Sequence, residues 1–131
     1  MDSKRACPHE RLVEGECTVT ECLFCKIAGK ELDSDIVHES DDIMVFRDIN
    51  PAAPLHVLAI PKEHVASVDE LNRNHAGVLA EILIALSTIA DREGTDGGYR
   101  IVTNVGPDAG QSVLHLHFHL LGGRPMAWPP G

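Results

Sequence analysis

One short segment near the C-terminus constrains the fold more than any other part of this sequence. Histidine and apolar residues alternate from Leu114 to Leu120, with histidines at positions 115, 117 and 119. A period of two predicts a β-strand, because successive side chains of a strand point to opposite faces of a sheet. We therefore predict a strand over 113–121 that packs one apolar face on a core and presents three imidazoles on the other.

The spacing of these histidines limits what they do together. On one face of a strand, neighbours lie about 7 Å apart and the outer two about 13 Å apart. Zinc requires each nitrogen at about 2.0–2.1 Å, so two neighbours could share a metal but three could not. A divided task fits better, in which one imidazole attacks phosphorus and the others orient it or move protons. A half-exposed strand that carries histidine by chance is the plainer alternative.

A glycine-containing loop comes immediately before the histidines. It runs from Gly106 to Ser112 and has a second glycine at position 110. Glycines let backbone N–H groups approach an anion closely, and a serine hydroxyl could steady a leaving group. Most such loops are only turns, so the loop alone is weak evidence for a phosphate site.

The remaining pattern predicts an α+β domain with a mainly antiparallel, five-stranded sheet, one long helix and one or two short ones. Apolar spacing predicts the long helix over 75–92, with Asn74 as its N-cap and Gly94 at its end. A short helix is expected over 22–28, ended by Gly29. Besides 113–121, strands are expected over 36–39, 43–46, 55–60 and 99–104. We expect residues 1–20 to form a flexible extension and residues 21–131 the domain.

The charge composition limits the kinds of molecule that this chain is expected to bind. The chain has 131 residues, 11 basic and 20 acidic, for a formal charge of −9. This balance argues against nucleic acid or an anionic membrane as a partner. The sequence has no apolar run long enough to span a bilayer and no signal-peptide pattern at its start, so we expect a cytoplasmic protein. Its four cysteines are then expected to be thiols or metal ligands.

Two of the cysteines, Cys22 and Cys25, have the spacing of half a tetrahedral zinc site. One such pair is weak evidence, because cysteine is also a small core residue. Cys7 and Cys17 have no assigned partner, and we have no functional interpretation of residues 1–20.

Several segments together resemble the histidine triad family. The histidine motif is joined by Cys22–Ile27, Phe46–Pro51, Ala53–His56, Ile60–His64, Gly98–Asn104, Ala109–Ser112 and Trp128–Gly131. The resemblance covers residues 21–131. The Trp-Pro-Pro-Gly ending and the third histidine resemble the Hint branch, which contains purine nucleoside phosphoramidases.

The resemblance implies a hydrolase that cleaves the P–N bond of purine nucleoside 5′-phosphoramidates and releases the nucleoside monophosphate. His117 would form a covalent nucleotidyl-histidine. It also implies a homodimer whose two sheets join into one. The alternatives are a hydrolase of dinucleoside polyphosphates or nucleotidyl conjugates, a nucleotide-binding interaction protein with little activity, and a zinc enzyme that uses the histidine row.

The resemblance also implies roles for single residues. The catalytic set would be His117, His119, His56, Ser112 and His115, with Ser112 near the leaving amine. The α-phosphate would be held by Asn104, Gly110, Gln111, Ser112 and Val113, together with His117 and His119. Asp48 would bind the ribose, and Phe24, Ile27, Phe46 and Ile49 would wall the base. Trp128 would reach the partner's site. Arg47 departs from the branch and could contact ribose or solvent.

For the cysteine pair, the resemblance implies a structural zinc held by Cys22, Cys25, His64 and His115. The phosphate chemistry would need no metal or other cofactor. The alternative is that both cysteines are reduced and partly buried, with His64 capping the start of a helix.

Overall fold

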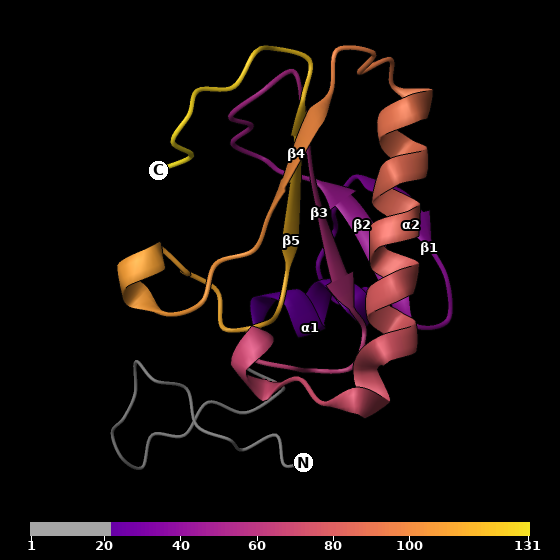
Figure 1. Cartoon of the computed structure of the whole chain (residues 1–131). Helices are drawn as coiled ribbons and strands as arrows, with labels where there is room; N and C mark the ends of the chain where they lie inside the picture. Colours follow the sequence, from indigo (N-terminus) through magenta and orange to yellow (C-terminus); the bar gives the residue numbers. More distant parts are fainter. Residues whose placement is uncertain (1–21) are drawn as a thin grey trace.

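The computed structural model describes residues 22–131 (Figure 1). The predictions for residues 1–20, including those for Cys7 and Cys17, lie outside this part of the chain. No helix within the described part is long and apolar enough to cross a membrane.

The described chain folds around one five-stranded antiparallel sheet, as predicted. Its strands are β1 (Ile36–Glu39), β2 (Ile43–Arg47), β3 (Leu55–Pro61), β4 (Tyr99–Val102) and β5 (Phe118–Gly122). Their order across the sheet is β1-β2-β3-β5-β4. Every neighbouring pair is antiparallel. Strand β3 therefore lies at the centre, with β5 beside it, and all seven of its residues are buried.

One long helix, α2 (Ala76–Arg92), covers one face of the sheet (Figure 1). Its apolar stripe places Ile82, Leu86 and Ile89 against side chains of the central strands, among them Val57 and Leu120. The predicted stripe is thus confirmed, but the predicted N-cap at Asn74 is wrong. A 3₁₀ turn, Arg73–His75, precedes the helix, and the Asn72 side chain caps that turn.

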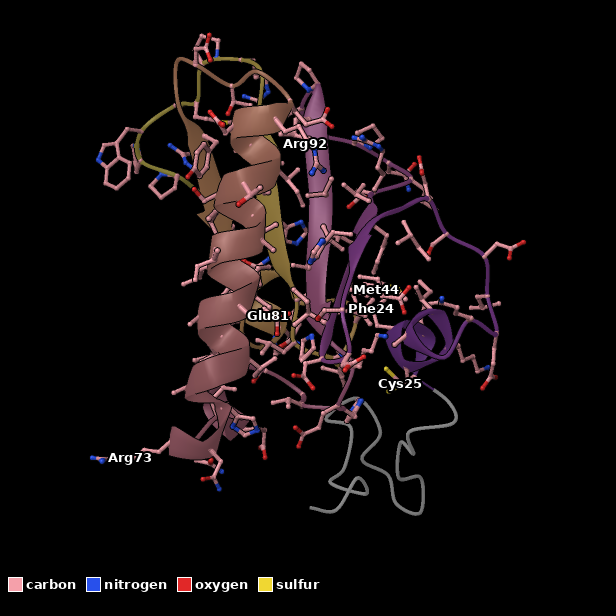
Figure 2. All side chains as sticks on the ribbon, turned by 90° about the vertical axis from the view of Figure 1, so that its right-hand side faces the viewer. Phe24, Cys25, Met44, Arg73, Glu81 and Arg92 are labelled. Atoms are coloured by element: carbon pink, nitrogen blue, oxygen red, sulfur yellow. The ribbon has the colours of Figure 1, made fainter. Side chains whose placement is uncertain are left out.

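A short helix, α1 (Leu23–Ala28), packs on the opposite face of the sheet. Cys22 is its N-cap, because the Cys22 sulfur accepts the N–H of Cys25, and Gly29 follows the last turn. Figure 2 shows Phe24 of α1 and Met44 of β2 on the side away from α2. They belong to a second apolar cluster with Phe46 and Leu58. The sheet is therefore covered by α2 on one face and in part by α1 on the other.

The last strand is shorter than predicted. Strand β5 begins at Phe118, so His115 and His117 lie before it, and His115 lies in a bend of the chain. Pairing of β5 with β3 stops at Ala59↔Phe118. Two residues further along β3 is Pro61, which has no N–H to donate to a ladder. The segment is held instead by a hydrogen bond from Leu116 N–H to the carbonyl of Val65 at 2.6 Å.

The neighbouring strand β4 also ends earlier than predicted, at Val102 rather than Asn104. Beyond it, the Thr103 hydroxyl donates to the carbonyl of His117 at 2.8 Å. A side-chain hydrogen bond thus replaces the ladder where the histidine segment leaves the sheet. Asn104 is consequently in a loop rather than a strand.

Candidate active site

The three histidines of the row enter different environments. The His115 ring is fully buried, with Nε2 2.8 Å from the carbonyl oxygen of Pro61. A carbonyl only accepts, so Nε2 carries the proton and Nδ1 keeps a lone pair. That Nδ1 faces the sulfurs of Cys22 and Cys25, at 3.3 and 3.4 Å. His115 therefore belongs to the cysteine cluster, and its ring is buried from solvent.

His117 lies next along the chain and is oriented by its own backbone. Its Nδ1 lies 2.7 Å from the carbonyl oxygen of His115. Because that oxygen only accepts, Nδ1 carries the proton and Nε2 keeps the lone pair. The Phe24 ring packs edge-on against the imidazole, with centroids 5.0 Å apart. Burial lowers the pKa of His117, so the ring is neutral at pH 7. Its Nε2 therefore has a free lone pair on a neutral ring, as a nucleophile requires.

His119 pairs with His56, which lies on the neighbouring strand β3. The N–H of Ala52 donates to His56 Nδ1 at 2.9 Å, which leaves the proton of a neutral His56 on Nε2. That Nε2 lies 2.9 Å from His119 Nδ1 and donates to it. His119 then carries its own proton on Nε2, the far side of the ring. One backbone amide thus sets the tautomers of two imidazoles.

Burial lowers the pKa of both rings. For His119 the pKa falls to about 4, because burial and then the neighbouring His117 and His56 disfavour a charge. For His56, burial lowers the pKa and the Asp48 carboxylate partly offsets this. Asp48 Oδ2 lies 3.4 Å from His56 Nε2. The three rings therefore stay neutral together at pH 7, although His117 and His119 have centroids only 5.1 Å apart.

Three of the four residues predicted to wall a base share one apolar cluster, and Phe24 of that cluster packs against His117. Phe24 and Phe46 are buried and pack edge to face, with centroids 5.5 Å apart, and Ile27 joins the same cluster. Ile49, in contrast, is 90% exposed. Asp48 uses Oδ1 to accept the N–H of Asn50 at 2.8 Å. The structure thus brings an apolar ring against His117 and a carboxylate beside His56.

The predicted phosphate loop is held by a side chain whose role we missed. Gln111 Oε1 accepts the N–H of Gly106 at 3.0 Å, and its Nε2 donates to the carbonyls of Ala66 and Val113 at 2.8 and 3.0 Å. The amide is thus turned into the protein, so only the main chain of Gln111 is available to a nucleotide. Gly106 and Gly110 adopt φ of 84° and 89°, which favour glycine. Ser112 is exposed.

The four predicted metal ligands form one cluster. The Cys25 sulfur lies 3.2 Å from His64 Nδ1, and the four ligand atoms all lie within 4.8 Å of one another. A tetrahedral zinc would separate sulfur and nitrogen ligands by about 3.5 Å. The Pro61 carbonyl on His115 is the outer hydrogen bond that zinc-binding histidines usually make. These residues fit a closed structural zinc.

Of the two cysteines in the cluster, Cys25 keeps its thiol proton more strongly than Cys22. A hydrogen bond from the Cys25 thiol lowers the pKa of Cys22, and the same bond and burial raise the pKa of Cys25. A thiolate is the form of cysteine that binds a metal. The alternative in which His64 caps a helix is not supported, because its Nδ1 faces Cys25.

A second group of ligand-type residues, Asp48, His56 and His119, also lies within 4.8 Å. This is where a zinc enzyme would hold its metal. The N–H of Ala52 on His56 Nδ1 keeps the proton on Nε2, the very atom that faces the group. A metal bound to His56 Nε2 would have to displace that proton. The group therefore favours proton transfer over metal binding.

The structure also shows the surroundings of Arg47 and Trp128, two residues for which the sequence predicts contacts. Arg47 shares the α2 face of β2 with Val45, and its guanidinium pairs with Glu93 at 3.2 Å and Asp35 at 3.7 Å. These ion pairs occupy the guanidinium on the α2 face, so the structure gives no support to a ribose contact of Arg47. Trp128 is 82% exposed near the C-terminus.

Comparison with known proteins agrees with these features. The family described as "Scavenger mRNA decapping enzyme C-term binding" matches residues 21–127. A solved HIT family hydrolase from Legionella pneumophila Philadelphia 1 is 50% identical with a TM-score of 0.82, and the match covers 84% of this chain and 99% of that one. The 14 kDa zinc-binding protein of Zea mays is 45% identical over 83% of this chain and 87% of its own. Adenylylsulfatase HINT1 of Arabidopsis thaliana is 43% identical over 83% and 76%.

Sheet order, the neutral imidazoles and the cysteine–histidine cluster together define a histidine triad protein. The chain belongs to the histidine triad (HIT) family. The resemblance inferred from the motifs is thereby confirmed over nearly the whole predicted domain.

Proposed function

We propose that this chain hydrolyses the P–N bond of purine nucleoside 5′-phosphoramidates and releases the nucleoside monophosphate. The observation that carries the proposal is the 2.7 Å hydrogen bond from His117 Nδ1 to the carbonyl of His115. It leaves a neutral Nε2 with a free lone pair on a buried ring. A nucleophilic imidazole of this kind suits attack on phosphorus.

The reaction proceeds in two displacements. His117 Nε2 attacks the α-phosphorus, an N–P bond forms, and the P–N bond to the amine breaks as the amine takes up a proton. The ring becomes cationic, and its Nδ1–H donates to the His115 carbonyl, which stabilises the charge. Water then attacks phosphorus and loses a proton, the N–P bond breaks, and the monophosphate leaves with His117 neutral again.

The other members of the site assist these steps. A proton taken from solvent makes the His56–His119 pair transiently cationic, His119 Nε2 then donates to the leaving amine, and the pair, neutral again, accepts the proton that the attacking water loses. Backbone N–H groups of residues 110–113, with Asn104, hold the phosphate oxygens, and Ser112 lies near the leaving amine. Asp48 binds the ribose, and Phe24, Ile27, Phe46 and Ile49 hold the base.

Zinc completes the proposal as a structural ion. The donor set of two cysteines and two histidines fits it, and two related plant proteins are named for zinc binding. When bound, zinc ties α1 to the segment before β5 through Cys22, Cys25, His64 and His115. It takes no part in the phosphate chemistry.

We also propose a homodimer in which two sheets join edge to edge. Strand β4 is an edge strand of the sheet. Beside it, a hollow of about 550 Å³ separates Tyr99 from Ser87 and Asp91 of α2. Leu83 and Ile84 of the same helix are 45% and 67% exposed, as is Tyr99 at 42%. A second copy would cover these apolar side chains, and Trp128 would reach its site.

The test is turnover of adenosine 5′-phosphoramidate by the wild-type chain and by His117→Ala, with circular dichroism showing that both are folded. We expect the wild type to release AMP and the variant to release none. Diadenosine polyphosphate and adenylylsulfate are offered in parallel, because one relative is named an adenylylsulfatase. Faster cleavage of either would replace the phosphoramidase with that activity, and equal turnover by His117→Ala would overturn the mechanism.

A further inference from the structure

We propose that the leaving amine of the substrate carries an anionic group, such as a carboxylate, which Arg100 and Arg124 bind. The inference rests on the proposed phosphoramidase function and names its class of leaving group. The observation behind it is a hollow that begins at the proton-transfer histidines and contains both guanidinium groups.

The hollow has a volume of about 440 Å³ and adjoins the proposed site of reaction. His56, His119 and Asn104 form one side of it. In the proposed reaction, the same His119 and Asn104 lie at the phosphorus atom. A group that leaves phosphorus on this side therefore enters the hollow, and 440 Å³ is space for an amino-acid-sized leaving group.

The two arginines reach the hollow from different parts of the chain. Arg100 lies on β4 and Arg124 follows β5. The Arg100 guanidinium donates to the carbonyl of Ala127 at 2.9 Å. Arg124 donates twice to the carbonyl of Ala52, at 3.2 and 3.0 Å, and once to that of Pro125 at 3.0 Å. Carbonyl oxygens orient a guanidinium but leave its full positive charge in place.

Neither arginine is neutralised within the described part of the chain. Between residues 22 and 131, no carboxylate lies within ion-pair distance of Arg100 or Arg124. The contrast with other cations is clear, since Arg47 pairs with two carboxylates and Lys62 pairs with Glu39 at 2.6 Å. In a chain with a formal charge of −9, two cations that pair with no carboxylate of residues 22–131 and border one hollow indicate a site for an anion.

The same geometry couples this site to the chemistry. Ala52 donates its N–H to His56 and accepts from Arg124 through its carbonyl. Arg124 is thus held by the residue that sets the histidine tautomers. Met126, Ala127, Pro129 and Pro130 form a less polar wall of the hollow. Together they suit an amine with an apolar stem and one negative charge.

The experiment compares two substrates that differ only in that charge. Adenosine 5′-phosphoramidates are made with phenylalanine and with 2-phenylethylamine, both joined through the amino nitrogen. We expect the wild type to have a kcat/KM for the phenylalanine compound higher by roughly fivefold, since ion pairs open to solvent contribute modestly each. In the double variant Arg100→Gln/Arg124→Gln, the ratio should fall toward one.

Arg73→Gln is the matched control, because Arg73 lies in the 3₁₀ turn before α2, at the end of the helix opposite to Arg92 (Figure 2). It should keep the wild-type ratio. A wild-type ratio of one or less would overturn the inference. So would an equal loss on both substrates in the double variant, because the guanidiniums would then hold the phosphate of the nucleotide itself.

A binding measurement separates this inference from the proposed function. The His117→Ala protein, which cannot form the covalent intermediate, is titrated with both compounds by calorimetry. Tighter binding of the phenylalanine compound, lost when both arginines are also replaced, supports the anion site even if the wild type cleaves neither compound. Equal affinity for the two compounds rejects the anion site even if the wild type cleaves both.

Discussion

The carbonyl oxygen of His115 lies 2.7 Å from Nδ1 of His117, while the ring of His115 lies in the cysteine cluster. One residue therefore belongs to the predicted zinc site through its side chain and orients the proposed nucleophile, His117, through its backbone. A displacement of His115 would move the His117 ring, because the backbone connects them directly. The predicted metal site and the proposed chemistry are thus connected through the backbone of His115.

Loss of a zinc ligand should lower both stability and activity. We expect Cys25→Ser to lose the zinc measured by elemental analysis. Stability should fall by about 4 kcal/mol if free zinc exceeds the dissociation constant about a thousandfold. Denaturant melts and AMP release check the two effects. Cys17→Ser, outside the predicted ligand set, is the control and should keep the metal. Full activity of a folded, zinc-free Cys25→Ser protein would contradict the link.

Activity should persist at more acidic pH than an ordinary histidine would allow. Burial lowers the pKa of His117, and only the neutral ring attacks. The acid limb of kcat/KM should therefore lie below pH 6.5, the usual pKa of histidine. Initial rates from pH 4 to 9, with folding monitored at each pH, provide the measurement. An acid limb centred above pH 6.5 would show that the folded protein does not hold His117 neutral.

Stability should fall with acid over a defined window. The pKa of His119 is lowered to about 4 in the folded chain, whereas an unfolded histidine titrates near 6.5. Between these values the unfolded state binds a proton that the folded state does not, so acid favours unfolding. We expect a loss of roughly 1–3 kcal/mol from pH 7 to 4 attributable to this ring. His119→Gln should show a shallower slope in urea melts, and an unchanged slope would refute the assignment.

Gln111 should matter through the loop that it holds. Gln111→Ala removes three hydrogen bonds to the main chain, from Gly106 and to Ala66 and Val113. Each such bond contributes about 1 kcal/mol, so we expect the loss of three to lower stability by about 3 kcal/mol. We also expect roughly a tenfold loss of kcat/KM as the phosphate-binding main chain loosens. Asn74→Ala, in the 3₁₀ turn before α2 and outside the proposed interface, is the control. A variant with lower stability but unchanged kinetics would make Gln111 purely structural.

Disruption of the apolar face should separate the proposed dimer. Ile84 is 67% exposed on α2, and Ile84→Asp would bury a carboxylate against the partner. Sedimentation at micromolar concentration should show a dimer for the wild type and a monomer for the variant. Asn74→Asp, outside the proposed interface, should remain dimeric. A wild-type chain that sediments as a monomer would remove the dimer from the proposal.

Local pattern predicted most of the elements. The stripe from Val78 to Ala90 and the alternation before Leu120 depend on repeats of 3.6 and 2 residues, which neighbouring side chains alone reveal. The ends of elements were less predictable. The N-cap of the long helix lies outside it at Asn72, and β5 starts at Phe118, because a preceding 3₁₀ turn and the position of Pro61 across the sheet decide these limits.

The predicted site residues came from motif spacing, but their roles depend on contacts far apart in the sequence. Spacing brought together the histidines, the cysteine pair and the glycine loop as candidates. It could not show that the Gln111 amide turns inward, that Arg47 faces α2, or that Arg100 and Arg124 border one hollow. Each of these facts joins residues from separate strands or loops.

The amino-acid order thus specifies a sheet, two helices and a row of imidazoles, because periodicity and residue chemistry are local properties. The tertiary structure decides the orientation and the tautomer of each imidazole. Pro61 and two sulfurs engage His115, the His115 carbonyl orients His117, and the N–H of Ala52 sets the proton on His56. Hydrogen-bond partners determine the tautomer of a neutral imidazole, and folding alone brings those partners within reach.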